Sequence, residues 1–170
     1  MRSLSPQLQQ QLQGMFGPRV AFDQLERMFY SHDVGSLPSL VRPLVGNTLP
    51  AAVVQPLNEE QVVQLVTLAR THGLPLVPRG KSTSGYGGVV PAKGGLVVDF
   101  AWMNQVVAVD AEALTVTVQP GVVWEKLDME LNKQGLALRT YPSSAPSSTA
   151  GGWLAQGGVG FGAYENGSSG

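Results

Sequence analysis

Hydrophobic residues recur at two spacings along this chain, and the two spacings predict an alternation of helices and strands. Near the start, four apolar residues at helical spacing predict a short amphipathic helix that ends at Gly17–Pro18: Leu4, Leu8, Leu12 and Met15. A second short helix is expected from about Gln24 to Phe29, with Asp23 as its cap. The polar, proline-spaced residues that follow, as far as Pro50, predict irregular structure.

The clearest pattern begins at Ala51 and predicts a strand, a helix and a second strand. Ala51–Gln55 favours a strand, and Asn58 with Gln61 is typical of a capping box at the start of a helix. This helix is expected to end at Gly73, and its apolar face is formed by Val62, Leu65, Val66 and Ala69. Leu74–Val77 then favours a short strand that leads into a glycine-rich loop. The order is typical of a βαβ unit.

Three further segments favour strands, and the simplest arrangement for them is a β-meander: Leu96–Phe100, Gln105–Val109 and Leu114–Val118. Another helix is expected between Gly121 and Gly135, with Val123, Leu127 and Leu131 on one face. The last 35 residues carry only two charges, Arg139 and Glu165. Surface loops usually carry more charge, so we expect protein or a ligand to cover much of this tail.

Composition excludes several classes of function. The chain has 170 residues, a formal net charge of −1 and no run of lysine or arginine, so a nucleic acid partner is not expected. It has no cysteine, which excludes disulfides, thiolate ligands and a cysteinyl cofactor link. Its two histidines, His32 and His72, have no partner at ligand spacing, so no metal site is expected. No apolar run of eighteen residues occurs, and we therefore expect a cytoplasmic protein without a transmembrane segment.

Glycine is concentrated in two short windows, which predicts two loops that hold phosphate. Six of the 21 glycines lie between Gly80 and Gly95 and eight between Gly151 and Gly170. Backbone without a Cβ lets successive amides approach an anion closely, and the first loop adds hydroxyls and the positive Arg79 and Lys81. From this loop alone, a solvent-facing turn is an equally good interpretation. The second window repeats the chemistry, so together they favour one large ligand whose diphosphate both loops reach.

Two better known phosphate motifs fit these windows poorly. Gly80, Lys81 and Ser82 imitate the end of a P-loop, but the first glycine of that motif would fall at Pro75 and no helix is expected after the serine. The second window satisfies only a loose dinucleotide fingerprint, without a strand before it. His32 and Asp33 could form an acid–base pair, although a histidine without further partners is more typical of a structural group.

Three blocks of the sequence, in this order, resemble the FAD-binding domain of the FAD-linked oxidases, the vanillyl-alcohol oxidase and p-cresol methylhydroxylase superfamily: residues 78–91, 94–138 and 141–167. The glycolate oxidase D-subunit and D-lactate dehydrogenase branch is the most similar. The resemblance implies an α+β fold, a p-cresol methylhydroxylase-type FAD-binding domain of two α+β subdomains that is incomplete at its C-terminus. It places this truncated domain at residues 45–170, after a helical and irregular extension at residues 1–44.

The resemblance also implies the residues that contact FAD. In the first loop these are Arg79, Gly80, Lys81, Ser82, Thr83, Ser84, Gly87 and Gly88, and in the second they are Pro142, Ser143, Ser144, Thr149, Gly151 and Gly152. Thr83 stands where covalent members of the family carry the flavin-linking histidine, which implies FAD bound without a covalent link. Lys81 and Ser82 depart from the small residue and glycine usual in the family, and Lys81 adds a charge-assisted contact.

The activity implied by the resemblance is oxidation of a 2-hydroxy acid such as D-lactate or glycolate, with hydride transfer to flavin N5. Two alternatives stay open: another alcohol or sugar substrate, or a non-catalytic module that keeps the fold without flavin. No residue can be assigned as the catalytic base. Family proteins continue with a substrate domain, so the chain is expected to be an inactive N-terminal fragment, with the substrate bound by the missing C-terminal part. The electron acceptor and any partner subunit are not indicated.

Overall fold

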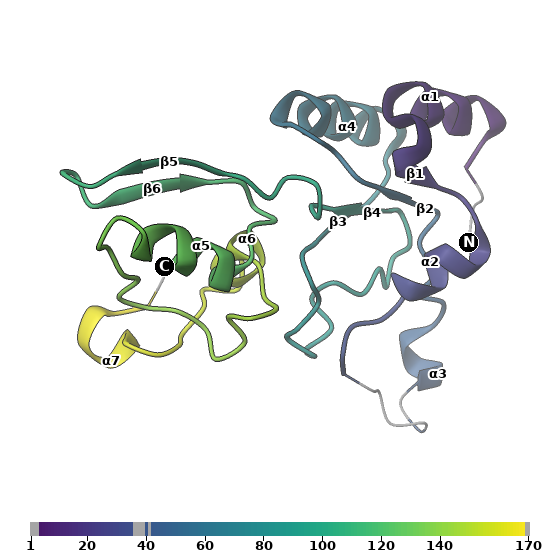
Figure 1. Ribbon diagram of the computed structural model, residues 1–170. Helices are drawn as coiled ribbons and strands as arrows, with labels where there is room; N and C mark the ends of the chain where they lie inside the picture. Colours follow the sequence, from purple (N-terminus) through teal and green to yellow (C-terminus); the bar gives the residue numbers. More distant parts are fainter. Residues whose placement is uncertain (1–3, 36–39, 41, 169–170) are drawn as a thin grey trace. The chain divides into compact units, whose positions relative to one another are not determined.

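The computed structural model describes residues 4–35, 40 and 42–168, and it divides into two compact units, Met1–Asp99 and Phe100–Gly170. The first unit contains a four-stranded sheet in the order β1-β2-β4-β3 (Figure 1). Its three longer strands are parallel to one another, and β1 pairs with β2 in the antiparallel direction. The bounds of the strands are β1 Val20–Ala21, β2 Ala52–Val54, β3 Leu76–Arg79 and β4 Leu96–Asp99.

The helices of the first unit lie on both sides of this sheet. Figure 1 shows α1 and α4 on one side and α2 on the other. The core between sheet and helices is formed by fully buried apolar side chains, among them Leu12, Phe16, Val53, Leu65 and Val97. Helix bounds are α1 Pro6–Phe16, the 3₁₀ turn η1 Gly17–Arg19, α2 Gln24–Phe29, α3 Arg42–Val45 and α4 Glu59–His72.

The local patterns of the first unit are confirmed where caps and periodicity are strong. The Asp23 carboxylate caps α2 and Asn58 caps α4 through the Gln61 amide, as predicted. Gly73 ends α4 in the left-handed conformation, with a φ of 61°. The prediction of irregular structure up to Pro50 is wrong at α3, and β1 was not predicted, because a strand of two residues has too short a pattern to stand out.

The prediction of a β-meander is wrong. Strand β4 lies between β2 and β3 in the parallel sheet, whereas β5 (Val106–Asp110) and β6 (Thr115–Val118) pair as a separate antiparallel hairpin. All four residues of β4 are buried, and the first three, Leu96 to Val98, form the continuous apolar run of a strand covered on both faces. The residues of β6 instead alternate between exposed and half-buried, as a hairpin with one covered face requires. The predicted βαβ unit is confirmed as β2-α4-β3, with β4 inserted between its two strands.

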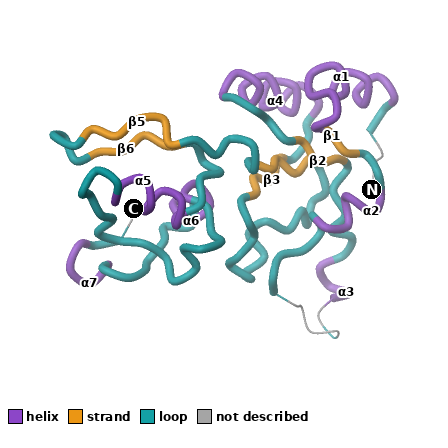
Figure 2. Tube along the Cα trace, viewed as in Figure 1, coloured by secondary structure: helices purple, strands orange, loops and turns teal. Residues whose placement is uncertain are grey.

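The second unit packs the hairpin and helices α5 and α6 around a small apolar cluster. Buried members of this cluster include Val122, Trp124, Leu127, Leu131 and Ala150. Figure 2 shows that loop accounts for most of the chain after α5. Pro142, Ser148, Thr149 and Gly158 are buried in this tail, whereas Phe161 and Tyr164 are exposed, so covering of the whole tail stays a prediction. The bounds are β5 Val106–Asp110, β6 Thr115–Val118, α5 Trp124–Asn132, α6 Ala150–Leu154 and α7 Ala163–Asn166.

In the part of the chain that the structure describes, every helix is too short or too polar to span a bilayer. The boundary expected near residue 45 stays a prediction. Residues on both sides of it contribute strands to the first unit, since β1 pairs with β2.

Candidate functional site

The first glycine-rich loop leaves the sheet at the carboxyl end of β3, directly after Arg79. In open parallel sheets, ligands bind beyond this end of the strands. The loop takes conformations that side chains usually avoid: Gly85 and Gly87 have φ values of 69° and 81°, and Ser82, which is not glycine, has a φ of 55°. A non-glycine residue in the left-handed region costs conformational energy, and such strain is frequent at ligand sites.

A row of main-chain donors in this loop has no acceptor in the part of the chain that the structure describes. Among residues 4–35, 40 and 42–168, no group accepts a hydrogen bond from the amides of Lys81, Ser82, Thr83 or Ser84. The side chains of Ser82, Thr83 and Ser84 are only half-buried, and that of Lys81 is exposed. Unpaired amides beside three hydroxyls and a cation match the chemistry of an anion site, so this loop fits a diphosphate.

The Arg79 side chain makes hydrogen bonds within the protein that the sequence did not indicate. Its Nη1 donates to the carbonyl oxygens of His32 at 2.9 Å and Tyr30 at 3.3 Å, and its Nη2 donates to that of Phe29 at 3.4 Å. The guanidinium also lies 5.0 Å from the centroid of the Tyr30 ring. Burial lowers the pKa of this guanidinium, yet arginine stays charged at neutral pH. It therefore stabilises the end of α2, and a contact of Arg79 with phosphate stays a prediction.

A cavity of about 400 Å³ adjoins the start of this loop, and α2 and the ends of β3 and β4 contribute its lining. The lining residues are Glu26, Phe29, Tyr30, Arg79, Gly80, Lys81, Ser82 and Asp99. The buried Asp99 carboxylate accepts hydrogen bonds from the Tyr30 hydroxyl and from Gln55 Nε2, both at 2.9 Å. Burial, and then the charge of Asp99, raise the pKa of Tyr30 to about 12. At neutral pH the Tyr30 phenol is therefore protonated and donates to Asp99 within this hydrogen-bonded wall.

Asp33 holds the far end of the loop, which the sequence did not indicate. Its Oδ2 accepts the Gly87 amide at 2.7 Å, and its Oδ1 accepts the Gly35 amide at 2.8 Å. The neighbouring His32 Nδ1 lies 3.0 Å from the Asp33 carbonyl oxygen. The pair is thus structural rather than an acid–base couple. Sequence patterns predict helices and strands from residues that are close together in the chain. The contact between Asp33 and Gly87 spans 54 residues, so no local pattern indicates it.

The second predicted loop is ordered by its own hydrogen bonds and by the start of α5. The Ser144 carbonyl accepts the amides of Ser147 and Ser148 and the Ser148 hydroxyl. The Trp124 amide in turn donates to the Ser148 carbonyl at 3.1 Å. Pro142 and Thr149 are buried, and Ser143 is exposed. Hydrogen bonds within the protein therefore define the shape of this loop.

The two glycines that follow Thr149 have different reasons to be glycine. A Cβ on Gly151 would lie 2.6 Å from Pro120 Cβ and 2.9 Å from its Cα and carbonyl oxygen, so this position is closed by packing. A Cβ on Gly152 would meet only Thr149 Oγ1, at 3.0 Å. Gly152 thus has room for close approach by a ligand, whereas the glycine at 151 is required by the protein itself.

The structure gathers the predicted residues into two groups, one in each unit. The residues from Arg79 to Gly88 lie in the first unit, and those from Pro142 to Gly152 lie in the second. Each group is continuous in space around its own loop. Their convergence on one diphosphate stays a prediction.

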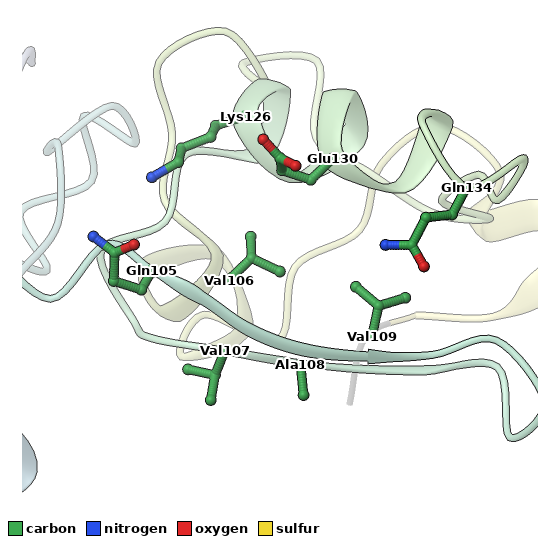
Figure 3. A pocket seen from close by; sticks show the side chains of 8 residues that line it. All are labelled: Gln105, Val106, Val107, Ala108, Val109, Lys126, Glu130 and Gln134. Carbon is green, nitrogen blue, oxygen red and sulfur yellow. The ribbon is translucent and has the colours of Figure 1, made fainter.

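A second cavity, of about 310 Å³, lies in the second unit between β5 and α5 and was not predicted (Figure 3). In Figure 3, Val106 and Val109 point toward α5 while Val107 and Ala108 point away. The two consecutive outward side chains mark the irregularity in the hairpin between Val106 and Ala108. The remaining lining residues are Gln105, Lys126, Glu130 and Gln134.

The sequence model of a family described as "FAD binding domain" matches residues 50–170. The chain belongs to this family. The predictions of the family and of FAD as its cofactor are confirmed, whereas the absence of a covalent link stays a prediction. The amides from Lys81 to Ser84, which have no acceptor among the described residues, match the chemistry of a diphosphate site, and their contact with FAD stays a prediction.

Relatives of this FAD-binding domain include enzymes of different chemistry. It is 41% identical over 105 residues to glycolate oxidase subunit GlcD of Bacillus subtilis, an overlap of 62% of this chain and 22% of that protein. It is 32% identical over 157 residues to alkyldihydroxyacetonephosphate synthase of Dictyostelium discoideum, covering 88% of this chain and 25% of that protein. The chain thus spans about a quarter or less of the length of these curated relatives.

Solved structures agree with the α+β assignment. A structure of alkyldihydroxyacetonephosphate synthase matches 98% of this chain and 34% of its own, with a TM-score of 0.85 and 29% identity. p-Cresol methylhydroxylase with substrate bound matches 90% of this chain and 29% of its own, with a TM-score of 0.74 and 22% identity, which supports the fold alone. The predicted p-cresol methylhydroxylase-type fold is confirmed.

Proposed function

We propose that this chain is the FAD-binding portion of a flavin-dependent oxidoreductase that oxidises a 2-hydroxy acid. One structural observation carries the proposal: four consecutive amides, Lys81 to Ser84, have no acceptor among the described residues, and they lie beside a cavity at the carboxyl end of a parallel sheet. The choice of a 2-hydroxy acid of the D-lactate or glycolate type is supported by the 41% identity to a glycolate oxidase subunit.

Within this proposal, the chain's residues bind and orient the cofactor. The amides from Lys81 to Ser84 hold the diphosphate, and Lys81 adds a positive charge. From the second unit, the residues proposed to contact FAD are Pro142, Ser143, Ser144, Thr149, Gly151 and Gly152. FAD, when bound, supplies the hydride acceptor of the reaction. Because Thr83 has no nucleophilic nitrogen, the cofactor is held without a covalent link.

A second candidate is a different reaction on the same fold. The similarity to alkyldihydroxyacetonephosphate synthase covers 88% of the chain, more than the 62% covered by the glycolate oxidase subunit. Since the chain spans about a quarter of either relative, we propose that the rest of the protein binds the substrate and selects between these chemistries. A non-catalytic module without flavin is the third possibility, and the unpaired amides disfavour it.

The test uses the full-length protein that contains this chain. Its absorbance spectrum should show bound flavin, and acid precipitation should release all the colour into the supernatant. In a separate sample of native protein without oxygen, D-lactate, glycolate and other 2-hydroxy acids should reduce the flavin and bleach its absorbance. Simple alcohols and sugars should not. Flavin that stays in the pellet would contradict the role of Thr83. A protein that takes up no FAD would overturn the proposal, and bleaching by alcohols or sugars alone would overturn its substrate class.

A further inference from the structure

The glycine-rich loop of the first unit is attached at two places to the end of α2 and the segment that follows it. At its start, the Arg79 guanidinium donates to the carbonyls of Phe29, Tyr30 and His32. At its far end, the Gly87 amide donates to Asp33 Oδ2 at 2.7 Å. The unpaired amides lie between these two attachments. A loop with several glycines loses much conformational entropy when it becomes ordered, so fixed ends lower the cost of holding the middle in a binding geometry.

Close backbone packing supports the attachment at Asp33. The Val34 amide donates to the Ser82 carbonyl at 3.4 Å, which turns that peptide's oxygen toward the Asp33 segment. A Cβ on Gly35 would collide with the carbonyl oxygen of Gly85, so only glycine allows the two backbones to lie this close. The segment from Asp33 to Gly35 therefore contacts the loop at three of its residues.

The charge of Asp33 is consistent with this role and not with direct contact to phosphate. A free carboxylate beside a diphosphate would repel it. Both Asp33 oxygens accept main-chain amides, and the residue is 9% exposed. Its charge is thus used to fix two donors of the protein, and it leaves the amides from Lys81 to Ser84 for a ligand.

We propose that Asp33 is a positioning residue for FAD: its carboxylate sets the geometry of the loop whose unpaired amides bind the diphosphate. This inference rests on the function proposed above. Loss of the carboxylate should leave Gly87 without its acceptor and should let the loop sample other conformations. The affinity for FAD should fall on the order of tenfold to a hundredfold, as expected for loss of hydrogen bonds to a charged group.

The experiment compares Asp33→Ala and Asp33→Asn with Asp23→Ala in the full-length apoprotein. Asp23 is a matched control because its carboxylate also accepts two main-chain amides in the same unit, those of Leu25 and Glu26, but caps α2 instead of the loop. FAD titration gives the dissociation constant, thermal unfolding gives the stability of the apoprotein, and hydrogen exchange of the segment 81–88 gives the order of the loop.

We expect both Asp33 variants to bind FAD more weakly and to exchange faster in the segment 81–88, while Asp23→Ala loses stability and keeps its FAD affinity. If Asp33→Ala does not fold, Asp33→Asn, which keeps the size of the side chain, decides the matter. Wild-type affinity in a folded Asp33 variant would overturn this inference and leave the proposed function intact. If Asp23→Ala loses as much FAD affinity as the Asp33 variants, Asp33 stabilises the fold in general and does not position the loop, which would also overturn the inference. Wild-type protein that binds no FAD would overturn the proposed function, and the inference with it.

Discussion

The phenol of Tyr30 donates a 2.9 Å hydrogen bond to the carboxylate of Asp99, which joins the end of α2 to the end of β4. Tyr30 also carries the Arg79 guanidinium against its ring face. This single aromatic residue thus connects a buried anion and a half-buried cation beside the proposed diphosphate loop. The wall of the cavity depends on it, and its ionisation offers a direct probe of that wall.

We expect Tyr30 to make stability fall as the pH rises from 10 to about 12. In the unfolded chain the phenol titrates near 10.0, whereas in the folded chain its pKa is about 12. Between these values the folded state holds a proton that the unfolded state has lost, so each increase in pH favours unfolding. The contribution is about 1 kcal/mol, because the partly exposed ring retains solvent screening.

Urea unfolding across this pH range measures the free energy of unfolding. The decrease caused by Tyr30 should appear in the wild type and be absent in Tyr30→Phe. Tyr164→Phe is the control, because Tyr164 is fully exposed and this variant should follow the wild-type curve. Parallel curves for wild type and Tyr30→Phe would show that the Tyr30–Asp99 contact does not govern the titration.

Gly80→Asp should abolish measurable FAD binding, whereas Gly80→Asn should weaken it much less. Gly80 lies between Arg79 and Lys81 and does not have a positive φ, so its backbone conformation does not by itself require glycine. The two variants have nearly the same size and differ in one negative charge beside the proposed diphosphate. We expect a difference on the order of tenfold or more in the dissociation constant, decreasing as salt is added. Equal affinities for the two variants would place the diphosphate elsewhere.

Gly151→Ala should destabilise the second unit, whereas Gly152→Ala should not. The new methyl at position 151 would press on Pro120, and overpacking of this kind costs roughly 1–3 kcal/mol. At position 152 the methyl meets only Thr149 Oγ1, and alanine is the better helix former within α6. Thermal unfolding of the apoprotein distinguishes them. A higher melting temperature for Gly151→Ala than for Gly152→Ala would contradict the packing seen at Pro120.

The same pair shows what sequence reasoning could and could not resolve. A glycine required by a ligand and a glycine required by a neighbouring proline look identical in one sequence. Gly151 and Gly152 were therefore both predicted to contact FAD. Elements with strong local signals, such as α4 with its Asn58 cap and Gly73 end, were predicted because their causes lie within a few residues. The place of β4 between β2 and β3 depends on contacts between distant segments, which no local period encodes.

Asp33 and Arg79 illustrate the same limit at the site itself. The loop was predicted from its glycines and hydroxyls, but the groups that hold it come from the irregular segment near residue 33. Arg79 was expected to face phosphate because it is basic and lies in the loop, and this contact stays a prediction. The sequence did not indicate that its guanidinium also donates to carbonyl oxygens at the end of α2, which is a favourable place for a cation.

Arg79 and Lys81 should therefore differ in what they lose when mutated. Arg79→Met removes hydrogen bonds from a charged donor to three carbonyls and should lower the free energy of unfolding by about 2 kcal/mol. Arg79→Lys should recover little of this, because an ammonium cannot reproduce the fork of donors. Lys81 is exposed, so Lys81→Met should change stability by less than about 0.5 kcal/mol. Its FAD affinity should fall several-fold and should lose part of its salt dependence.

Urea unfolding of the apoproteins and FAD titration at two salt concentrations separate the two roles. If Arg79→Met unfolds at the wild-type urea concentration, the guanidinium does not hold the end of α2. If Lys81→Met binds FAD as tightly as wild type at low salt, the lysine is simply solvated. The amides from Lys81 to Ser84 would then have to hold the diphosphate without help from a side-chain charge.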